Sequence, residues 1–139
     1  MWQHRERLTP WRCCSPVLQA ALLAALVDPV LPAHSERRLE LVNACLPDIT
    51  EVFPWDVEEK LGKEPAPLLL DIREPDEYDA MHIQGSLHVP RGILETAVER
   101  DHEETEPELV KARDKRIVVV CRSGSRSVVA AYTLKRMGY

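Results

Sequence analysis

The stretch IVVVCRSGSRSVVAAYTLKRMG, residues 117–138, decides the fold of this chain. Ile117–Val120 is β-branched throughout and too short for a helix, so it predicts a buried strand. The segment from about Ser127 to Met137 has helical spacing, and Gly138 is the residue type expected just past a helix end. A buried strand that leads through a short loop into a helix is typical of an α/β domain.

The residues before this stretch repeat the same alternation. Leu68–Ile72 is a continuous apolar run, and Ser86–Val89 is a brief run stopped by a proline, so both predict strands. Helices are expected over 75–80 and 92–99, and the alternation in Ile49–Phe53 predicts one more short strand. We therefore predict an α/β fold with a mostly parallel sheet flanked by helices.

The amino-terminal third lacks the alternation of strands and helices predicted for the rest of the chain. A helix is expected from about Ser35 to Leu46, so residues 1–46 are interpreted as a helical extension and 47–139 as the main domain. The basic start and the apolar run Val17–Val27 resemble a secretory signal over residues 1–35, which would place the protein in the periplasm; the favoured alternative is a helix in a cytoplasmic protein. The run is well short of the ~20 residues that a membrane-spanning helix needs, so no stable span is expected.

Composition narrows the functional classes. Across 139 residues, 45% are hydrophobic and 29% charged, which is ordinary for a globular protein. The net charge of −5 disfavours nucleic-acid binding as the main role. The four cysteines include no C-x-x-C pair and the five histidines show no paired spacing, so neither a metal nor a cofactor is expected.

The chemistry centres on Cys121. In parallel sheets ligands bind beyond the carboxyl ends of the strands, and Cys121 directly follows a predicted strand. The small residues Ser123, Gly124 and Ser125 allow a tight loop whose backbone N–H groups surround an anion, and Arg122 and Arg126 add positive charge. A helix amino terminus contributes about 0.3–2 kcal/mol to such a site. We therefore predict a thiol with a lowered pKa; the alternative is a buried cysteine that only packs.

Two longer segments together resemble a single-domain rhodanese, a sulfurtransferase. They are Leu68–Pro90 (LLLDIREPDEYDAMHIQGSLHVP) and residues 117–139, and the likeness extends over roughly Ile49–Tyr139. The motifs are D-x-R-x-x-x-E (Asp71, Arg73, Glu77), H-I-x-G (His82 to Gly85) and the cysteine loop.

The resemblance implies a ping-pong reaction in which Cys121 accepts a sulfane sulfur as a persulfide. The donor would be a small anion such as thiosulfate, attracted by Arg122 and Arg126, and the acceptor a thiol or cyanide. The predicted substrate-binding residues are Arg122, Ser123, Gly124, Ser125, Arg126 and Ser127. The predicted supporting residues are Asp71 and Arg73, which hold loops beneath the site, and Arg91, for which a surface role is the alternative.

Two other functions stay open. Cysteine-dependent phosphatases have the pattern C-x5-R, whereas here Ser127 holds that position and Arg126 comes one residue earlier, so sulfur transfer is favoured. The second alternative is a non-catalytic rhodanese-like module that binds a partner or senses oxidants through Cys121.

The carboxyl end departs from the family pattern. Family members continue past the Met-Gly-Tyr equivalent with a further strand and a helix that contains G-G-x-x-x-W, whereas this sequence ends at Tyr139. The resemblance places that strand beside the active-site strand, so the domain is expected to be incomplete and to have an exposed sheet edge. Either the sequence is a fragment, or the amino-terminal extension or another subunit covers this edge.

Overall fold

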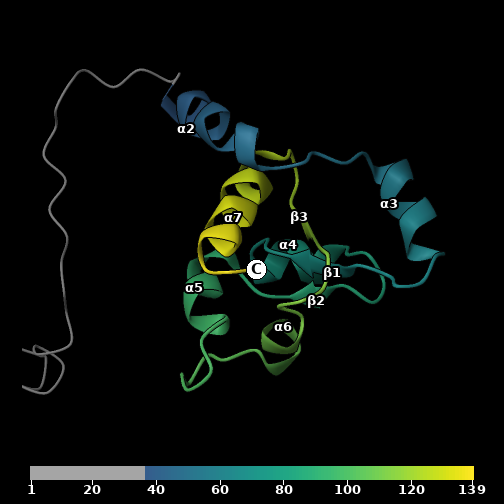
Figure 1. The fold of residues 1–139 in the computed structure, drawn as a ribbon, viewed down its shortest axis with the longest axis vertical. Coiled ribbons are helices and arrows are strands. Elements are labelled where there is room, and N and C mark those ends of the chain that lie inside the picture. Colours follow the sequence, from purple (N-terminus) through teal and green to yellow (C-terminus); the bar gives the residue numbers. More distant parts are fainter. Residues whose placement is uncertain (1–36) are drawn as a thin grey trace, which may run out of the picture. The chain divides into compact units, whose positions relative to one another are not determined.

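Three short parallel strands form the centre of the chain (Figure 1). The structure is a computed structural model that describes residues 37–139; the predictions for the signal-like segment and for Val17–Val27 lie outside them. The strands are β1 (Leu68–Asp71), β2 (Leu87–His88) and β3 (Ile117–Val120), in the order β2-β1-β3. In the register, Asp71 lies opposite His88 on one side and Val120 on the other, so the carboxyl ends of all three strands meet at one edge. The predicted α/β fold with a parallel sheet is confirmed.

Helices precede, connect and follow these strands. In chain order they are α2 (Arg37–Cys45), η1 (Leu46–Asp48), α3 (Pro54–Leu61), α4 (Pro75–Ala80), η2 (Arg91–Ile93), α5 (Leu94–Ala97), α6 (Pro107–Lys111) and α7 (Ser125–Arg136). Proline opens α3, α4 and α6, where its fixed φ suits the first turn and its missing N–H costs no hydrogen bond. No helix of residues 37–139 is both long and apolar enough to cross a bilayer.

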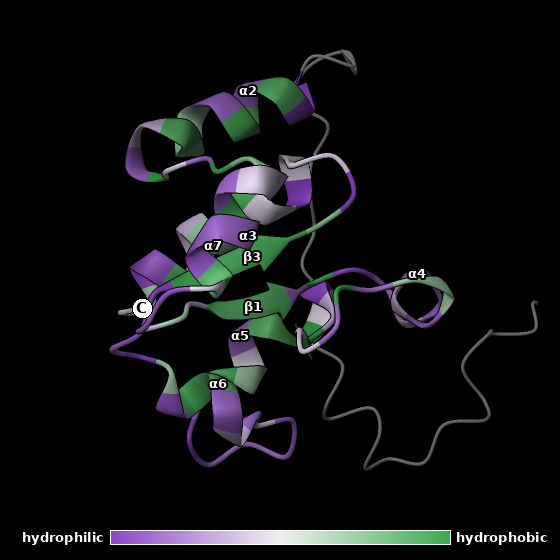
Figure 2. Ribbon diagram, turned by 90° about the vertical axis from the view of Figure 1, so that its right-hand side faces the viewer, coloured by the Kyte–Doolittle hydropathy of each residue, from purple (hydrophilic) through white to green (hydrophobic). Residues whose placement is uncertain are grey.

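The two faces of the sheet are covered by different helices. On one face, Leu70 and Ile72 are fully buried against apolar residues of α5, α6 and α7, among them Leu94, Leu109 and Leu134. On the other face, Leu69 and Val118 pack against Val57 of α3. Figure 2 shows the result: β1 and β3 are hydrophobic, whereas the surrounding helices also carry hydrophilic residues.

The strand predicted over Ile49–Phe53 is not observed, so that prediction is wrong. Ile49 has extended backbone angles, but 49–53 pairs with no strand within the described part of the chain. A cavity of about 720 Å³ lies between residues 48–52 and the outer side of β3, lined by Val52, Ile117 and Val128 among others. Alternating residues alone do not make a strand, because the strand conformation depends on a neighbour to bond with.

Candidate active site

Cys121 follows β3 directly, at the edge where the parallel strands end. Its side chain is half-buried and its thiol is free. The chain then turns through residues 122–124 and enters α7 at Ser125, two residues earlier than predicted. The turn depends on Gly124, whose φ of +88° lies in the left-handed region that residues with a Cβ rarely adopt. The loop therefore brings the amino terminus of α7 close to the Cys121 sulfur.

Backbone N–H groups of this loop point at the sulfur, as predicted. Gly124 N–H donates a hydrogen bond to Cys121 Sγ at 3.1 Å, and Ser127 N–H donates one at 3.3 Å. The Ser127 hydroxyl oxygen lies 3.4 Å from Sγ and donates its own proton to the Gly124 carbonyl at 2.8 Å. That carbonyl also accepts a bond from Val128 N–H. The Ser127 hydroxyl can therefore turn toward a thiolate without leaving the Gly124 carbonyl unpaired.

These hydrogen bonds shift the acidity of the thiol. Burial by itself raises the pKa of Cys121, because it removes water from the charged form. The Ser127 hydroxyl and the backbone N–H groups of Ser127, Ser123 and Gly124 oppose burial and outweigh it, so the pKa lies below its ordinary value. A thiolate is the nucleophilic form of cysteine, so the arrangement favours attack by sulfur.

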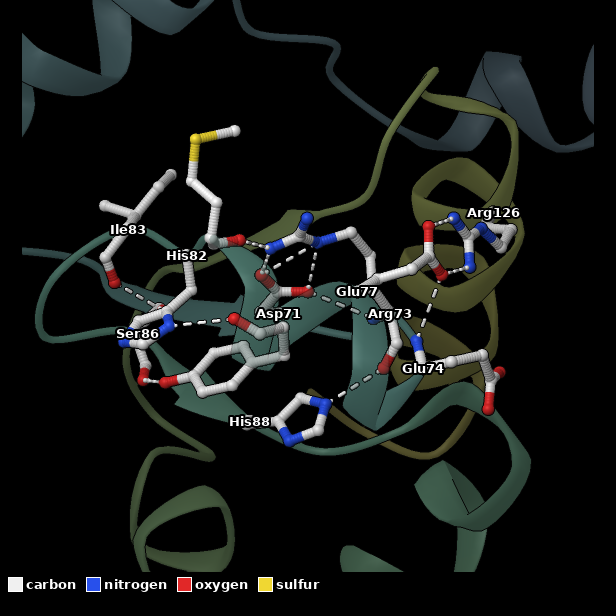
Figure 3. Close-up of polar contacts among 11 residues, drawn as sticks. Asp71, Arg73, Glu74, Glu77, His82, Ile83, Ser86, His88 and Arg126 are labelled. Atoms are coloured by element: carbon white, nitrogen blue, oxygen red, sulfur yellow. Dashed lines mark hydrogen bonds and ion pairs between the residues drawn. The ribbon is translucent and has the colours of Figure 1, made fainter.

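Arg126 is bound to a carboxylate. Its guanidinium donates two hydrogen bonds to Glu77 of α4, at 2.7 and 2.8 Å (Figure 3). Arg126, together with the Glu74 N–H, lowers the pKa of Glu77 to about 2. The pair joins α4 to the first turn of α7 and so braces the cysteine loop, while the Glu77 charge offsets that of Arg126.

A second clamp lies at the end of β1. Asp71 is fully buried, and Arg73 Nη2 donates to it at 2.7 Å and to the Met81 carbonyl at 2.7 Å (Figure 3). Burial raises the pKa of Asp71, but its hydrogen bonds from Arg73 outweigh burial and lower it. Asp71 and Arg73 therefore hold the connection from β1 to β2, and neither side chain makes a hydrogen bond to Cys121.

Aromatic stacking holds the same connection. The Tyr78 ring lies between those of His82 and His88, with centroid separations of 4.0 and 4.1 Å. The Tyr78 hydroxyl donates to the Ser86 carbonyl at 2.9 Å, and His88 Nε2 bonds to the Arg73 carbonyl at 2.9 Å. These contacts fix the loop that follows α4.

The other predicted site residues have different surroundings. Arg122 and Ser123 are exposed on the loop, and Ser125 is half-buried at the start of α7. Arg91 donates two hydrogen bonds at 2.9 Å to Glu95, so its charge is already paired. One residue that the sequence did not single out also reaches the loop: Arg38 of α2 donates to Ser125 Oγ at 2.8 Å. No local pattern indicates this contact, because the two residues are 87 positions apart.

Comparison with known proteins fits this geometry. The model of the rhodanese-like domain matches residues 54–139, which include the strands, Glu77 and the whole cysteine loop. The chain belongs to the rhodanese-like domain family.

Curated relatives of this rhodanese-like chain have names connected with sulfur transfer. The putative sulfur carrier protein YrkF of Bacillus subtilis is 33% identical over 91 residues, which are 66% of this chain and 44% of that protein. A putative mitochondrial thiosulfate sulfurtransferase of Schizosaccharomyces pombe is 33% identical over 95 residues, 63% of this chain and 67% of that protein. The chain thus spans less than half of the first relative and about two thirds of the second.

Two solved structures share the rhodanese-like fold. The polysulfide-sulfur transferase homodimer of Wolinella succinogenes is 28% identical with a TM-score of 0.51, covering 77% of this chain and 78% of that one. A Rhodopseudomonas palustris protein of unknown function, described as a possible tyrosine phosphatase, has a TM-score of 0.67, covering 81% of this chain and 83% of that one. Its identity is 24%, so this likeness concerns the fold alone.

Proposed function

We propose that this rhodanese-like chain moves a sulfane sulfur from an anionic donor such as thiosulfate to a thiophilic acceptor, through a persulfide on Cys121. The observation that carries the proposal is the set of N–H groups from Gly124 and Ser127 directed at Cys121 Sγ. They stabilise negative charge on Sγ in the thiolate, the form that attacks the donor. Support also comes from the names of the relatives.

The reaction has two steps. The Cys121 thiolate attacks the outer sulfur of thiosulfate; a new S–S bond forms, the old one breaks, and its electron pair leaves with sulfite. The acceptor, a thiolate or cyanide, then attacks the outer sulfur of the persulfide; a thiol acceptor first loses its proton to solvent. The bond between the two sulfurs breaks and returns the thiolate, so no general base is required in either step.

The first test is sulfur loading. After treatment with thiosulfate, we expect an adduct of about 32 Da, one sulfur atom, on the peptide that contains Cys121. Cyanide should then release thiocyanate and restore the original mass. Cys121→Ser should abolish both observations, while Cys45→Ala, which removes a buried thiol in α2, should retain them.

Other outcomes would identify a different function. Loading of Cys121 without turnover with thiols or cyanide would make the chain a sulfur carrier that delivers to a partner protein, as the name of the Bacillus relative suggests. Phosphomonoester hydrolysis that depends on Cys121, without sulfur loading, would contradict the proposal. Two features argue against phosphate binding. Arg126 is one position closer to the cysteine in sequence than the arginine of C-x5-R, and its charge is paired with Glu77.

We propose the cytoplasm as the compartment. Cys45 and Cys121, the two cysteines within residues 37–139, are free thiols, and persulfide chemistry at a thiol suits a reducing environment. Fractionation of expressing cells checks this, and recovery in the periplasm would contradict it.

A further inference from the structure

The segment formed by α2 and η1 lies along α7 and is tied to it at both ends. At one end, Arg38 Nη1 donates to Ser125 Oγ at 2.8 Å. At the other, Lys135 Nζ donates to the carbonyl of Asp48 at 2.9 Å and to its carboxylate at 3.1 Å. Ser125 opens α7 and Lys135 lies in its last turn, so the α2–η1 segment runs in the same direction as α7. Arg38 is therefore at the end of α7 that carries the cysteine loop.

Three arginines of the predicted site and its clamps already have a carboxylate partner. Arg126 is paired with Glu77, Arg73 with Asp71 and Arg91 with Glu95. Among residues 37–139, Arg38 and Arg122 make no salt bridge, and both are exposed. Arg122 is part of the loop and Arg38 contacts it through Ser125. Neither charge is offset by a paired carboxylate.

The distance to the sulfur allows an electrostatic effect. Gly124 N lies 3.1 Å from Sγ, and Ser125 Oγ lies 2.8 Å from Arg38 Nη1. The covalent path from Gly124 N to Ser125 Oγ joins these two contacts. Adding its greatest length to the two distances places the Arg38 guanidinium within roughly 13 Å of Sγ. The Debye length is ~10 Å at 0.1 M salt and ~30 Å at 0.01 M, so the charge acts on an approaching anion most strongly at low ionic strength.

We infer that Arg38 recruits the anionic sulfur donor to Cys121, as a positive charge that α2 places beside the cysteine loop. This inference rests on the proposed function for the identity of the donor. Arg38 lies before residue 54, where the match to the family begins, so the feature comes from the chain's own preceding helix. The ligand that this charge attracts is a small anion, and it attracts a dianion such as thiosulfate more strongly than a monoanion.

The test uses two reagents that alkylate the same thiol and differ in charge. Iodoacetate is an anion and iodoacetamide is neutral, so the ratio of their alkylation rates at Cys121 measures the attraction of anions. A change in the reactivity of the thiol affects both rates equally and does not alter the ratio. The rates are followed on the Cys121 peptide by mass spectrometry at low ionic strength. The variants are Arg38→Gln, Arg38→Lys and the matched control Arg136→Gln, an exposed arginine at the far end of α7, ~16 Å along the helix from Ser125.

We expect Arg38→Gln to lower the iodoacetate-to-iodoacetamide ratio by about threefold at low salt, with the iodoacetamide rate unchanged. Arg38→Lys should keep most of the ratio, Arg136→Gln all of it, and 0.5 M salt should remove the difference. With thiosulfate, Arg38→Gln should raise KM by a similar factor and leave kcat unchanged. An unchanged ratio, or an equal fall in both alkylation rates, would overturn the inference.

The two proposals fail in different ways. If thiosulfate produces no adduct on Cys121 in any variant while the ratio still depends on Arg38, the sulfurtransferase proposal is wrong and Arg38 still attracts anions. If thiocyanate is formed and the ratio does not depend on Arg38, the opposite conclusion holds.

Discussion

At the scale of single residues, the acidity of Cys121 depends on a few hydrogen bonds. Burial disfavours the thiolate, and the donors around Sγ more than compensate. Three of these donors are backbone N–H groups, those of Ser123, Gly124 and Ser127, which follow from the conformation of the loop and from Gly124 in particular. The hydroxyl of Ser127 is the one side-chain contribution, so it can be removed without changing the backbone.

Ser127→Ala should therefore raise the pKa of Cys121. A hydrogen bond to a charged group contributes about 1.5 kcal/mol, so alkylation by iodoacetamide at neutral pH should slow by about fivefold to tenfold. The measurement is the rate of Cys121 alkylation between pH 5 and pH 10. Ser127→Thr keeps a hydroxyl at this position and should restore most of the rate. A profile of Ser127→Ala that coincides with that of the wild type would contradict the role of this hydroxyl.

At the scale of elements, the cysteine loop is held between helices. Glu77 on α4 and Arg126 on α7 form a two-bond ion pair that joins the element after β1 to the element after β3. The Asp71–Arg73 clamp holds the start of the connection that carries α4. Helix α2 meets the same loop from another side through Arg38. The loop is thus positioned by α7, which follows it directly, and by α2 and α4, which are distant from it in sequence.

The ion pair predicts how stability depends on pH. The pKa of Glu77 is lowered from 4.5 to about 2, so its contribution to stability is complete above pH 4.5 and is lost as the pH falls through about 2. We expect Glu77→Gln to unfold at lower urea concentration than the wild type at pH 7, and the difference to shrink below pH 4.5. A double-mutant cycle with Arg126→Gln isolates the pair. A coupling energy that is the same at pH 7 and pH 2 would contradict the assignment.

At the scale of the whole molecule, stability rests on the apolar residues that the strands bury. Leu70 is fully buried at the centre of β1, in contact with the cluster formed by α5, α6 and α7. Because Asp71 and Ile72 follow it directly, the packing of Leu70 also positions the edge of the sheet on which the site is built. The position of the site therefore depends on the packing of β1 in the core.

Leu70→Ala should destabilise the protein by about 2–5 kcal/mol, since it removes buried methyl groups and leaves a cavity. Leu41→Ala is the matched control, because Leu41 of α2 is 55% exposed and its truncation should cost less than about 0.5 kcal/mol. Urea unfolding followed by circular dichroism measures both. Equal losses of stability in the two variants would show that Leu70 does not belong to the core.

The sequence by itself determined the parts of this protein that depend on neighbouring residues. The apolar runs of β1 and β3 predicted strands, because a short continuous run of apolar residues is typical of a strand covered on both faces. The cysteine loop was predicted because its small residues, its glycine and the following helix are contiguous, and these are what direct N–H groups at Cys121. The prediction of a strand over Ile49–Phe53 was wrong, because a strand also needs a neighbouring strand to bond with. Local alternation of apolar residues does not reveal whether one is present.

The tertiary structure alone decided which side chains meet. Glu77 and Arg126 are 49 residues apart, and Arg38 and Ser125 are 87 apart. Their distances depend on how α2, α4 and α7 pack around the sheet. Packing is governed by the shapes of buried apolar surfaces, whereas these polar contacts lie at the rim and form only once the helices are in place. Which arginine is neutralised and which stays available to an anion is therefore a property of the folded chain.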